Sequence, residues 1–311
     1  DRIESRGLGD VYKRQQEQYS LGNTVSVASP VMIELAETLV DTVEIAEWAL
    51  FGKNGGDSTQ LAVMISRQET GKDKVLKING GYHGANGWMQ REGSPGTIDS
   101  DSSEVISIPW NNIEEFDSVI SKFENEIACF ISSPFHHPTS EDNVLPKKGY
   151  WEHIQKVCNE KNIIIIVDDV RTGFRIDLAG SNQAFNFSPD LVCLGKAIAN
   201  GYPISALVGK NYLKEAANKV YFSGTQFFNS APMAAAIATI NELKNIDAIS
   251  LMQYHGNDLK NKMISMAKSY DIDLKVTGVP SMPYFRIENE DQELHFKWVD
   301  NCLSKGIYMT S

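Results

Sequence analysis

The chain has 311 residues, of which 42% are hydrophobic, and its 40 acidic and 29 basic side chains give a net charge of −11. This acidic balance argues against nucleic acid or an anionic membrane as the main partner. No apolar run approaches the roughly 20 residues that a membrane span needs. The cysteines lie far apart, which argues against a zinc knuckle or a disulfide framework and favours a reducing, cytoplasmic setting; they are Cys129, Cys158, Cys193 and Cys302.

Residues 1–19 are polar and show no clear period. We expect them to be a non-native or disordered leader, and the alternative is a mobile natural terminus. The patterned sequence that follows predicts a large domain over 20–243 and a partial, smaller C-terminal domain over 244–311.

Apolar residues recur at helical spacing after Ser29, which can cap a helix whose first residue is Pro30. A glycine loop, FGKNGGDST, precedes a second helix, expected over 58–70 and ended by Gly71. DKVLKI is typical of a strand and leads into NGGYHG, and the composition of 85–104 predicts a loop.

Strands and helices alternate from residue 126 onward. EIACFIS, NIIIIVDD and DLVCLGK are typical of strands, GYWEHIQKVCNEK is typical of a helix, and SAPMAAAIATINELKN begins a long helix. Near-continuous apolar strands separated by helices indicate a parallel sheet that is covered on both faces. We therefore predict a three-layer αβα fold with a mostly parallel central sheet. Helix mixed with short strands such as PYFRI predicts a smaller, incomplete α/β domain after it.

Two of the predicted strands end in charged residues. Asp168 and Asp169 follow one strand, and Lys196 follows another. Open parallel sheets bind ligands beyond the carboxyl ends of their strands, so the acid and the amine could face one pocket. A plain salt bridge at the sheet edge is the alternative reading of the same residues.

Weaker signals elsewhere favour the pocket. Gly55 and Gly56 open a helix whose backbone N–H groups and dipole could hold a phosphate. Tyr82, between glycines, could stack on a flat ligand, although a buried tyrosine is commoner, and Thr225 in FSGTQF could be a second phosphate donor. Together these signals describe a pocket for a phosphorylated, flat, charged heterocycle beside a lysine.

Two longer segments carry a family resemblance. VDDVRTGFR followed by PDLVCLGKAIANGYPISALVG closely resembles the signature of class III aminotransferases, which are pyridoxal-phosphate enzymes of fold type I. The stretch from FGKNGGDST to GGYHG resembles the phosphate loop and ring-stacking segment of the same family. The resemblance extends from about residue 21 to residue 311, and the nearest branch looks like glutamate-1-semialdehyde 2,1-aminomutase and its aminotransferase relatives. It implies pyridoxal 5'-phosphate as cofactor and amino-group transfer on an amine or amino acid, either between two molecules or within one.

The resemblance also implies a role for individual residues. Lys196 would form the Schiff base with the cofactor and then move a proton at the substrate, while Asp168 would keep the pyridine nitrogen protonated. Val170 and Tyr82 would pack on the two ring faces, and Gly56 and Asp57 would hold the phosphate through their backbone N–H groups. The threonine matching Thr225 reaches the partner subunit's phosphate in the family, which implies a homodimer. The implied cofactor-binding set is Gly55, Gly56, Asp57, Tyr82, His83, Asp168, Val170, Lys196 and Thr225, and no metal is expected.

The sequence departs from the family pattern at three positions. Ser133 replaces a glutamate that commonly arranges the substrate site, which leaves the substrate preference open. Asp169 replaces a glutamate after the strand. Asp57 stands where relatives often have threonine or serine, and its carboxylate would repel a phosphate unless it capped the helix instead.

Three further polar residues have simpler interpretations. His136 and His137 are expected to contact substrate rather than a metal, because no acidic or cysteine ligand lies at a fixed offset. Arg175 is expected to form a structural ion pair rather than to bind substrate. His83 could equally be a hydrogen-bonded loop histidine.

Two other functions remain open. The chain could be a truncated or non-catalytic relative that binds the cofactor or serves as an assembly subunit. It could also be a nucleotide-binding α/β protein with Lys196 in a structural ion pair, although it has neither G-x-x-x-x-G-K-[ST] nor G-x-G-x-x-G.

Overall fold

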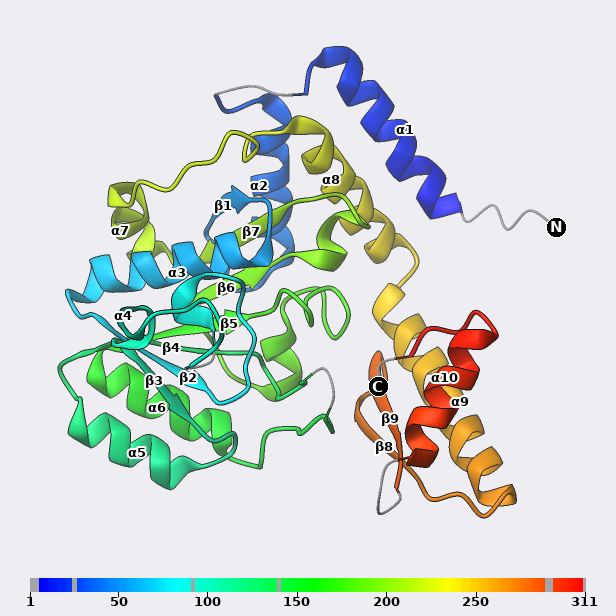
Figure 1. The fold of residues 1–311 in the computed structure, drawn as a ribbon. Helices are drawn as coiled ribbons and strands as arrows, with labels where there is room; N and C mark the ends of the chain where they lie inside the picture. Colours follow the sequence, from blue (N-terminus) through cyan, green and yellow to red (C-terminus); the bar gives the residue numbers. More distant parts are fainter. Residues whose placement is uncertain (1–5, 24–26, 91–92, 139–140, 289–292, 310–311) are drawn as a thin grey trace. The chain divides into compact units, whose positions relative to one another are not determined.

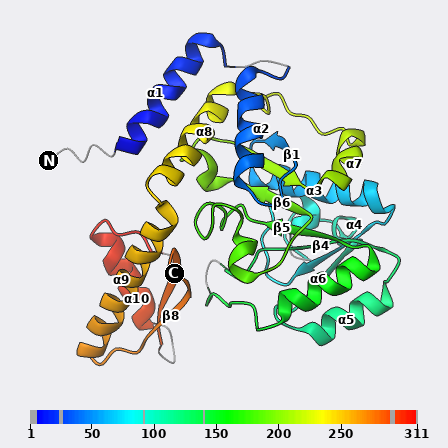
Figure 2. The same ribbon diagram turned by 180° about the vertical axis from the view of Figure 1, so that it is seen from behind.

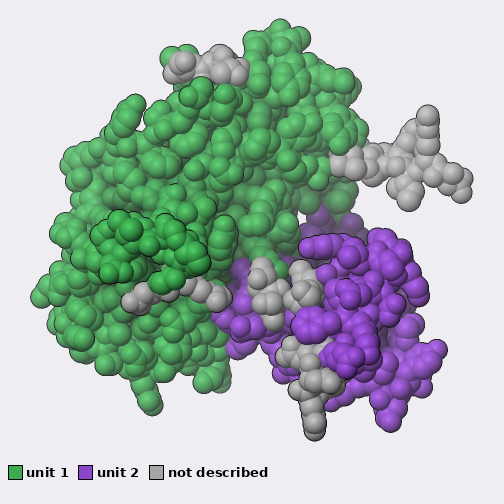
Figure 3. All heavy atoms as spheres, viewed as in Figure 1, with its two compact units in different colours: residues 1–134, 146–246 green, residues 135–145, 247–311 purple. Residues whose placement is uncertain are grey.

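A computed structural model describes residues 6–23, 27–90, 93–138, 141–288 and 293–309. The chain forms two compact units, each assembled from two stretches (Figure 3). Unit 1 contains Asp1–Pro134 and Pro146–Ile246, and unit 2 contains Phe135–Leu145 and Asp247–Ser311. The expected domain boundary at 243/244 lies close to the second of these divisions, but the sequence did not indicate that residues 135–145 join unit 2.

Unit 1 is built on a seven-stranded sheet with the order β1-β7-β6-β5-β4-β2-β3 (Figure 1). The run from β3 to β6 is parallel, and β7 pairs antiparallel with both β6 and β1. This mostly parallel sheet confirms the predicted fold class. The strands are β1 (Trp48–Gly52), β2 (Lys74–Ile78), β3 (Val105–Ile108), β4 (Ile127–Ser132), β5 (Ile164–Asp168), β6 (Leu191–Leu194) and β7 (Ser205–Gly209).

Helices cover both faces of the sheet and bury a separate apolar cluster on each. On one face pack α2 (Pro30–Thr42), α5 (Ile113–Lys122), α6 (Tyr150–Lys161) and α8 (Ser230–Asn245). On the other pack α3 (Gly55–Thr70) and the short α7 (Lys214–Lys219), as the opposite views of Figures 1 and 2 show. Every residue of β4 and β5 is buried, because both of their faces are covered.

Helix α3 begins at Gly55, three residues before the predicted start. The Asp57 carboxylate accepts the backbone N–H groups of Lys53 and Asn54, both at 2.8 Å, and so satisfies two donors at the helix entrance. The helix ends at Gly71, whose φ of +66° is the left-handed conformation that glycine adopts without strain.

The polar leader contains a helix, α1 (Arg6–Leu21), which packs against α8. The expectation over 1–19 was a non-native or disordered leader: the helix differs from disorder, whether the segment is non-native stays a prediction, and residues 1–5 lie outside the described structure. Val11, Gln15 and Gln18 are buried at helical spacing. Two of these three side chains are polar, and for that reason the hydrophobic pattern gave no signal. The predicted loop over 85–104 likewise contains η1 (Gly87–Met89) and α4 (Asp99–Ser102).

Unit 2 is a two-stranded antiparallel sheet, β8 (Leu274–Val279) and β9 (Met282–Ile287), with α9 (Ala248–Ser269) and α10 (Glu293–Ser304). Residues 135–145 are held to this sheet by polar contacts: the Asn143 backbone N–H donates to Thr277 Oγ1 at 3.0 Å. Arg286 Nε and Nη2 donate to the two carboxylate oxygens of Asp142 at 3.0 and 2.9 Å. Among the described residues of both units, no helix has the length and apolar character to cross a bilayer.

Candidate active site

The two charged residues singled out in the sequence leave the sheet at the same edge. Strands β5 and β6 are parallel neighbours, and Asp168 is paired with Cys193. Asp168 is the last residue of β5, and Lys196 opens the short helix η3 (Lys196–Ala199) just beyond β6. The carboxyl ends of the two strands therefore carry the acid and the amine side by side.

Asp168 is buried and is held from two directions. Its Oδ2 lies 2.7 Å from Nδ1 of His83, and the backbone N–H of Val170 donates to its Oδ1 at 3.2 Å. His83 is itself buried, and its backbone carbonyl accepts a hydrogen bond from Thr59 Oγ1 at 2.6 Å. His83 therefore contacts the carboxylate, a role that the sequence did not identify. The only signal was the position of His83 in the turn after β2, a strand that β4 separates from the β5 strand of Asp168.

Lys196 is a partly exposed residue with a backbone φ of +42°. Its pKa is lowered from the ordinary value, chiefly because the surrounding protein removes water from the ammonium group. The Asp168 carboxylate opposes this shift, while the positive charges of Arg175 and Arg171 add to it. Asp168 and Lys196 are thus electrostatically coupled, and Lys196 holds its proton less firmly than an ordinary lysine.

Two segments, the start of α3 and the end of β6, pack closely against Val170. A Cβ atom added to Gly55 would lie 2.6 Å from Val170 Cγ1, and one added to Gly195 would lie 3.1 Å from the same atom. A Cβ on Gly56 would lie 3.4 Å from the Cα of Gly84. Glycine at these positions lets the start of α3, the end of β5, the end of β6 and the turn after β2 approach one another closely.

Asp57 does not direct its carboxylate outward, because both hydrogen bonds to its Oδ2 come from the backbone at the start of α3. Its own backbone N–H donates to the Asn54 carbonyl at 2.9 Å. The resemblance implies Gly56 and Asp57 as backbone phosphate donors, which stays a prediction. Because the Asp57 N–H is engaged here, the N–H groups of Gly55 and Gly56 are the donors at the start of α3 that lack a partner within the helix.

Tyr82 and Thr225 stand apart from this group. Tyr82 is 72% exposed, and Thr225 is exposed in the connection between α7 and α8. Within the described ranges, no hydrogen bond or ring contact joins either side chain to the other predicted residues. Phe222, earlier in the same connection as Thr225, lines a small hollow together with Asp57 and Ser58 at the start of α3.

Asp169 has a structural role. Its carboxylate accepts hydrogen bonds from Thr172 Oγ1 and, at 3.0 Å, from the Ser181 backbone N–H. Burial raises the pKa of this carboxyl group, and the hydrogen bonds oppose the rise. Asp169 thereby fixes the turn that follows β5.

The histidine pair belongs to unit 2, where His136 and Val144 exchange backbone hydrogen bonds. Burial lowers the His136 pKa, and Glu141 opposes this. The expected contact of the pair with substrate stays a prediction. The described part of the chain contains no cluster of three or more His, Cys, Asp or Glu side chains that could hold a metal ion.

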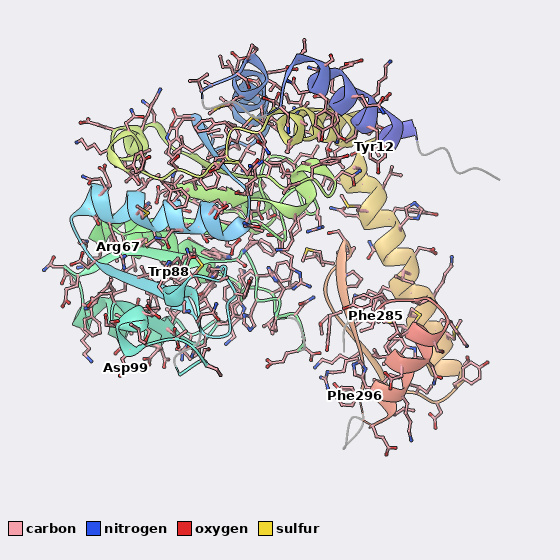
Figure 4. All side chains as sticks on the ribbon, turned by 45° about the horizontal axis from the view of Figure 1, so that its top comes forward. Tyr12, Arg67, Trp88, Asp99, Phe285 and Phe296 are labelled. Carbon is pink, nitrogen blue, oxygen red and sulfur yellow. The ribbon has the colours of Figure 1, made fainter. Side chains whose placement is uncertain are left out.

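These features fit pyridoxal phosphate part by part. A buried carboxylate suits the pyridine nitrogen, and the glycine-bounded surface of Val170 suits a flat ring. The N–H groups that open α3 suit the phosphate, and an amine with a lowered pKa suits the aldehyde. In Figure 4 Trp88 lies beside α3, where its indole N–H donates to Gln60 at 2.6 Å and helps to hold the turn that carries His83.

Comparisons with known proteins agree with this fit. The class III aminotransferase family matches residues 6–311. The aminopentol aminotransferase of Sphingopyxis macrogoltabida is 34% identical over 293 residues, which cover 94% of this chain and 69% of that protein. The glutamate-1-semialdehyde 2,1-aminomutase of Methanobrevibacter smithii is 30% identical, over 96% of this chain and 75% of that protein.

A solved structure of similar fold contains the cofactor. The PLP internal aldimine form of the Sphingopyxis sp. MTA144 FumI protein superimposes with a TM-score of 0.92 at 32% identity, over 99% of this chain and 73% of that one. From the matched sequence, the fold and the site, we conclude that this chain belongs to the class III aminotransferases, enzymes that use pyridoxal phosphate to transfer amino groups.

Proposed function

We propose that this chain is an aminotransferase that moves an amino group from a primary amine to an oxo acid, with Lys196 as the cofactor-binding and proton-carrying amine. One observation carries the proposal: Asp168 and Lys196 end neighbouring parallel strands at one edge, and the charge of the first acts on the second. A structural salt bridge alone would not require the glycines around Val170.

Residues of this chain would hold the cofactor at separate points. Asp168 would contact the pyridine nitrogen, with His83 fixing the carboxylate from behind at 2.7 Å. The N–H groups of Gly55 and Gly56 would hold the phosphate, and Val170 and Tyr82 would face the two sides of the ring. When bound, pyridoxal phosphate supplies an electrophilic carbonyl carbon and a ring that accepts electrons.

Lys196 would act as nucleophile and then as base, and both roles need the neutral amine. Loss of hydration around Lys196 and the charges of two nearby arginines favour that neutral form. Its Nζ would accept the proton from the substrate carbon that bears the amino group. Asp168, close enough to favour the protonated lysine, would stabilise the ammonium formed by that transfer.

An aminomutase is the second candidate, because glutamate-1-semialdehyde 2,1-aminomutases match about as much of this chain as the aminotransferase does. Both reactions share their first half, so the acceptor distinguishes them. An aminotransferase delivers the amino group of a donor amine to an added oxo acid such as pyruvate. An aminomutase returns it to the same carbon skeleton.

We also propose a cytoplasmic homodimer in which Thr225 reaches the phosphate of the partner subunit. The exposure of Thr225 supports this arrangement, since its hydroxyl is accessible to a second subunit. Analytical ultracentrifugation of the loaded protein tests the dimer. Absorbance titration with pyridoxal phosphate tests the contact: the Thr225→Ala dimer should bind the cofactor more weakly than the wild-type dimer.

The decisive experiment compares the wild type with Lys196→Ala, both purified with pyridoxal phosphate. We expect the wild type to show a visible absorption band that changes on addition of a primary amine, and to aminate pyruvate. Lys196→Ala should retain its far-UV circular dichroism and lose both responses. Lys262→Ala is the matched control, because Lys262 is exposed and, among the residues that the structure describes, forms an ion pair with Asp258 alone, on α9.

Turnover of Lys196→Ala at the wild-type rate would show that another group carries the chemistry. A wild-type band that ignores every amine would instead support the non-catalytic relative. Absence of a band in the wild type and in Lys196→Ala would support the nucleotide-binding alternative.

A further inference from the structure

A lysine is buried in the central sheet of unit 1. Lys77 lies on β2 and is only 5% exposed. Val75, two residues earlier, belongs to the apolar cluster beneath α3, so the alternation of the strand directs Lys77 to the same face. Burial lowers the pKa of its ammonium group. A buried cation is costly unless it has acceptors, so the contacts of Lys77 indicate what it does.

Both acceptors that the described structure gives to Lys77 are backbone carbonyls. Its Nζ donates to the carbonyl oxygens of Met89 and Gln90, each at 3.2 Å. These carbonyls lie at the end of η1, where a helix leaves its last carbonyls without partners inside the helix. An ammonium group has three donors and can serve both carbonyls at once. Lys77 therefore connects the sheet to the loop that follows β2.

The same loop packs against the turn that carries His83. Met89 is buried, and its Sδ would lie 2.5 Å from a Cβ atom added to Gly84. The sulfur also lies 4.0 Å from Thr59 Oγ1, which donates to the His83 carbonyl at 2.6 Å. The Met89 side chain therefore lies directly against the backbone at His83 and Gly84.

Helix α3 supplies neutral contacts to this loop, and Lys77 supplies a charged one. Gln60 Oε1 accepts hydrogen bonds from Asn86 Nδ2 at 3.0 Å and from the Trp88 indole N–H at 2.6 Å. Hydrogen bonds from an ionised donor are about twice as strong as neutral ones. Loss of the Lys77 amine should therefore loosen the loop more than loss of one neutral partner, because two carbonyls would lose their donor together.

We propose that Lys77 is a positioning residue of the active site, which holds the loop after β2 through Met89 so that His83 meets Asp168. The contact that it would maintain is the 2.7 Å approach of His83 Nδ1 to Asp168 Oδ2. The inference rests on the proposed function in one respect, the contact of Asp168 with the pyridine nitrogen. It adds a residue in the sheet interior on which the orientation of that carboxylate depends.

Chemical labelling of His83 tests its position directly. The full chain, with and without pyridoxal phosphate, is treated with diethyl pyrocarbonate, and modified histidines are quantified by peptide mass spectrometry. His83 Nε2 is buried, so we expect slow labelling in the wild type. Lys77→Met nearly keeps the side-chain length and removes the donor, and His83 should then be labelled about fivefold faster or more. Lys77→Arg restores charged donors and should return the rate toward that of the wild type.

Lys74→Met is the matched control. Lys74 lies on the same strand, and its Nζ pairs with Glu104 and Glu126 at 2.8 and 3.1 Å, both outside the loop over 79–90. This variant also removes an amine from β2, so it reports any general loss of stability. His83 should be labelled in it at the wild-type rate.

Absorbance titration with pyridoxal phosphate connects this position to cofactor binding. Lys77→Met should raise the dissociation constant about fivefold, because Asp168 loses support from His83. In the His83→Ala background, the same substitution should change it by less than about twofold, because the contact is already absent. Faster labelling of His83 together with unchanged cofactor affinity in Lys77→Met and in His83→Ala would support the positioning role and refute the proposed contact of Asp168 with the cofactor.

Three results would overturn the positioning role. One is equal labelling of His83 in the wild type and Lys77→Met, and another is an equal acceleration in Lys74→Met. The third is a rise in the dissociation constant of the same size with and without His83, because Lys77 would then act by another route. If Lys77→Met does not fold, Met89→Ala decides the question, since it removes the side chain that packs against the turn and should expose His83 to the same reagent.

Discussion

The contact between Gly55 and Val170 gives a sharp test of how the site is built. Gly55→Ala places a methyl group 2.6 Å from Val170 Cγ1 and 2.9 Å from Cγ2, whereas ordinary contact begins near 3.4 Å. Val170 is buried and branched, so either its side chain or the start of α3 must move by about 0.8 Å. Overpacking of this kind costs about 1–3 kcal/mol.

One smaller effect offsets part of that cost. Alanine restricts the unfolded chain more than glycine does, which returns about 0.4–1 kcal/mol. We therefore expect Gly55→Ala to destabilise the unloaded protein by about 1–2 kcal/mol. The dissociation constant for pyridoxal phosphate should rise as well, because both the phosphate donors and the surface of Val170 are displaced.

Val170→Ala is the matched variant that removes the steric overlap. It removes both γ-methyls and leaves only the Val170 Cβ, at 3.3 Å from the new methyl, a distance that a small adjustment accommodates. Alone it should cost about 1–2 kcal/mol through lost burial. The double variant should lose less unfolding free energy than the two single variants lose together, by at least about 1 kcal/mol.

Urea unfolding of the four proteins measures the stability cycle, and absorbance titration with pyridoxal phosphate measures the binding cycle. Additive stability costs, within about 0.5 kcal/mol, would mean that Gly55 and Val170 do not share one packed contact. The proposed close packing of the start of α3 against Val170 would then be incorrect.

Three further predictions address charge. His83→Ala should raise the dissociation constant for pyridoxal phosphate about tenfold, since Asp168 loses its 2.7 Å partner; His83→Asn, whose amide can donate from nearly the same position, should recover part of this, and wild-type affinity in both variants would refute the positioning role. The hydrogen bonds from Arg286 hold the Asp142 pKa at about 2, below its ordinary 3.8, although partial burial acts in the opposite direction. The contribution of this ion pair to the free energy of unfolding is fully present above the pKa of Asp142 in the unfolded chain, and it is lost as the pH falls through the pKa in the folded protein. Asp142→Asn should therefore cost about 1 kcal/mol at neutral pH after screening, and less as the pH falls below about 4, in urea unfolding of the two proteins; a cost independent of pH would contradict the ion pair. Labelling of Lys196 by trinitrobenzenesulfonate in the unloaded protein, read by peptide mass spectrometry, should reach half its maximum below pH 10.5, because the pKa is lowered; a midpoint at or above that of surface lysines would refute the shift.

The sequence predicted the centre of the fold better than its margins. Strands β4, β5 and β6 are uninterrupted apolar runs, so their location and the charged residues after them follow from composition alone. The start of α3 was placed late, because two glycines disfavour a helix and the cap that stabilises it comes from Asp57 inside the helix.

Contacts distant in sequence could not be predicted. Tyr82 and His83 are adjacent in sequence but differ in burial: Tyr82 is 72% exposed, whereas His83 is buried against Asp168. No local sequence pattern indicates which of the two side chains points into the protein. The membership of residues 135–145 in unit 2 depends on Asp142 meeting Arg286. Arg175 forms no ion pair among the described residues, contrary to the expectation from the sequence, and one of its N–H groups donates to the Arg171 backbone carbonyl instead. This outcome depends on which acidic side chains the fold brings near it.

The discontinuous make-up of unit 2 has a consequence for biosynthesis. Its first stretch, residues 135–145, leaves the ribosome before the whole of 146–246, and its hairpin β8–β9 comes later still. Until Arg286 emerges, the carboxylate of Asp142 lacks the guanidinium that anchors it. The strands of the central sheet can therefore assemble during translation, whereas the smaller unit folds late, because residues 135–145 are synthesised well before the hairpin that binds them.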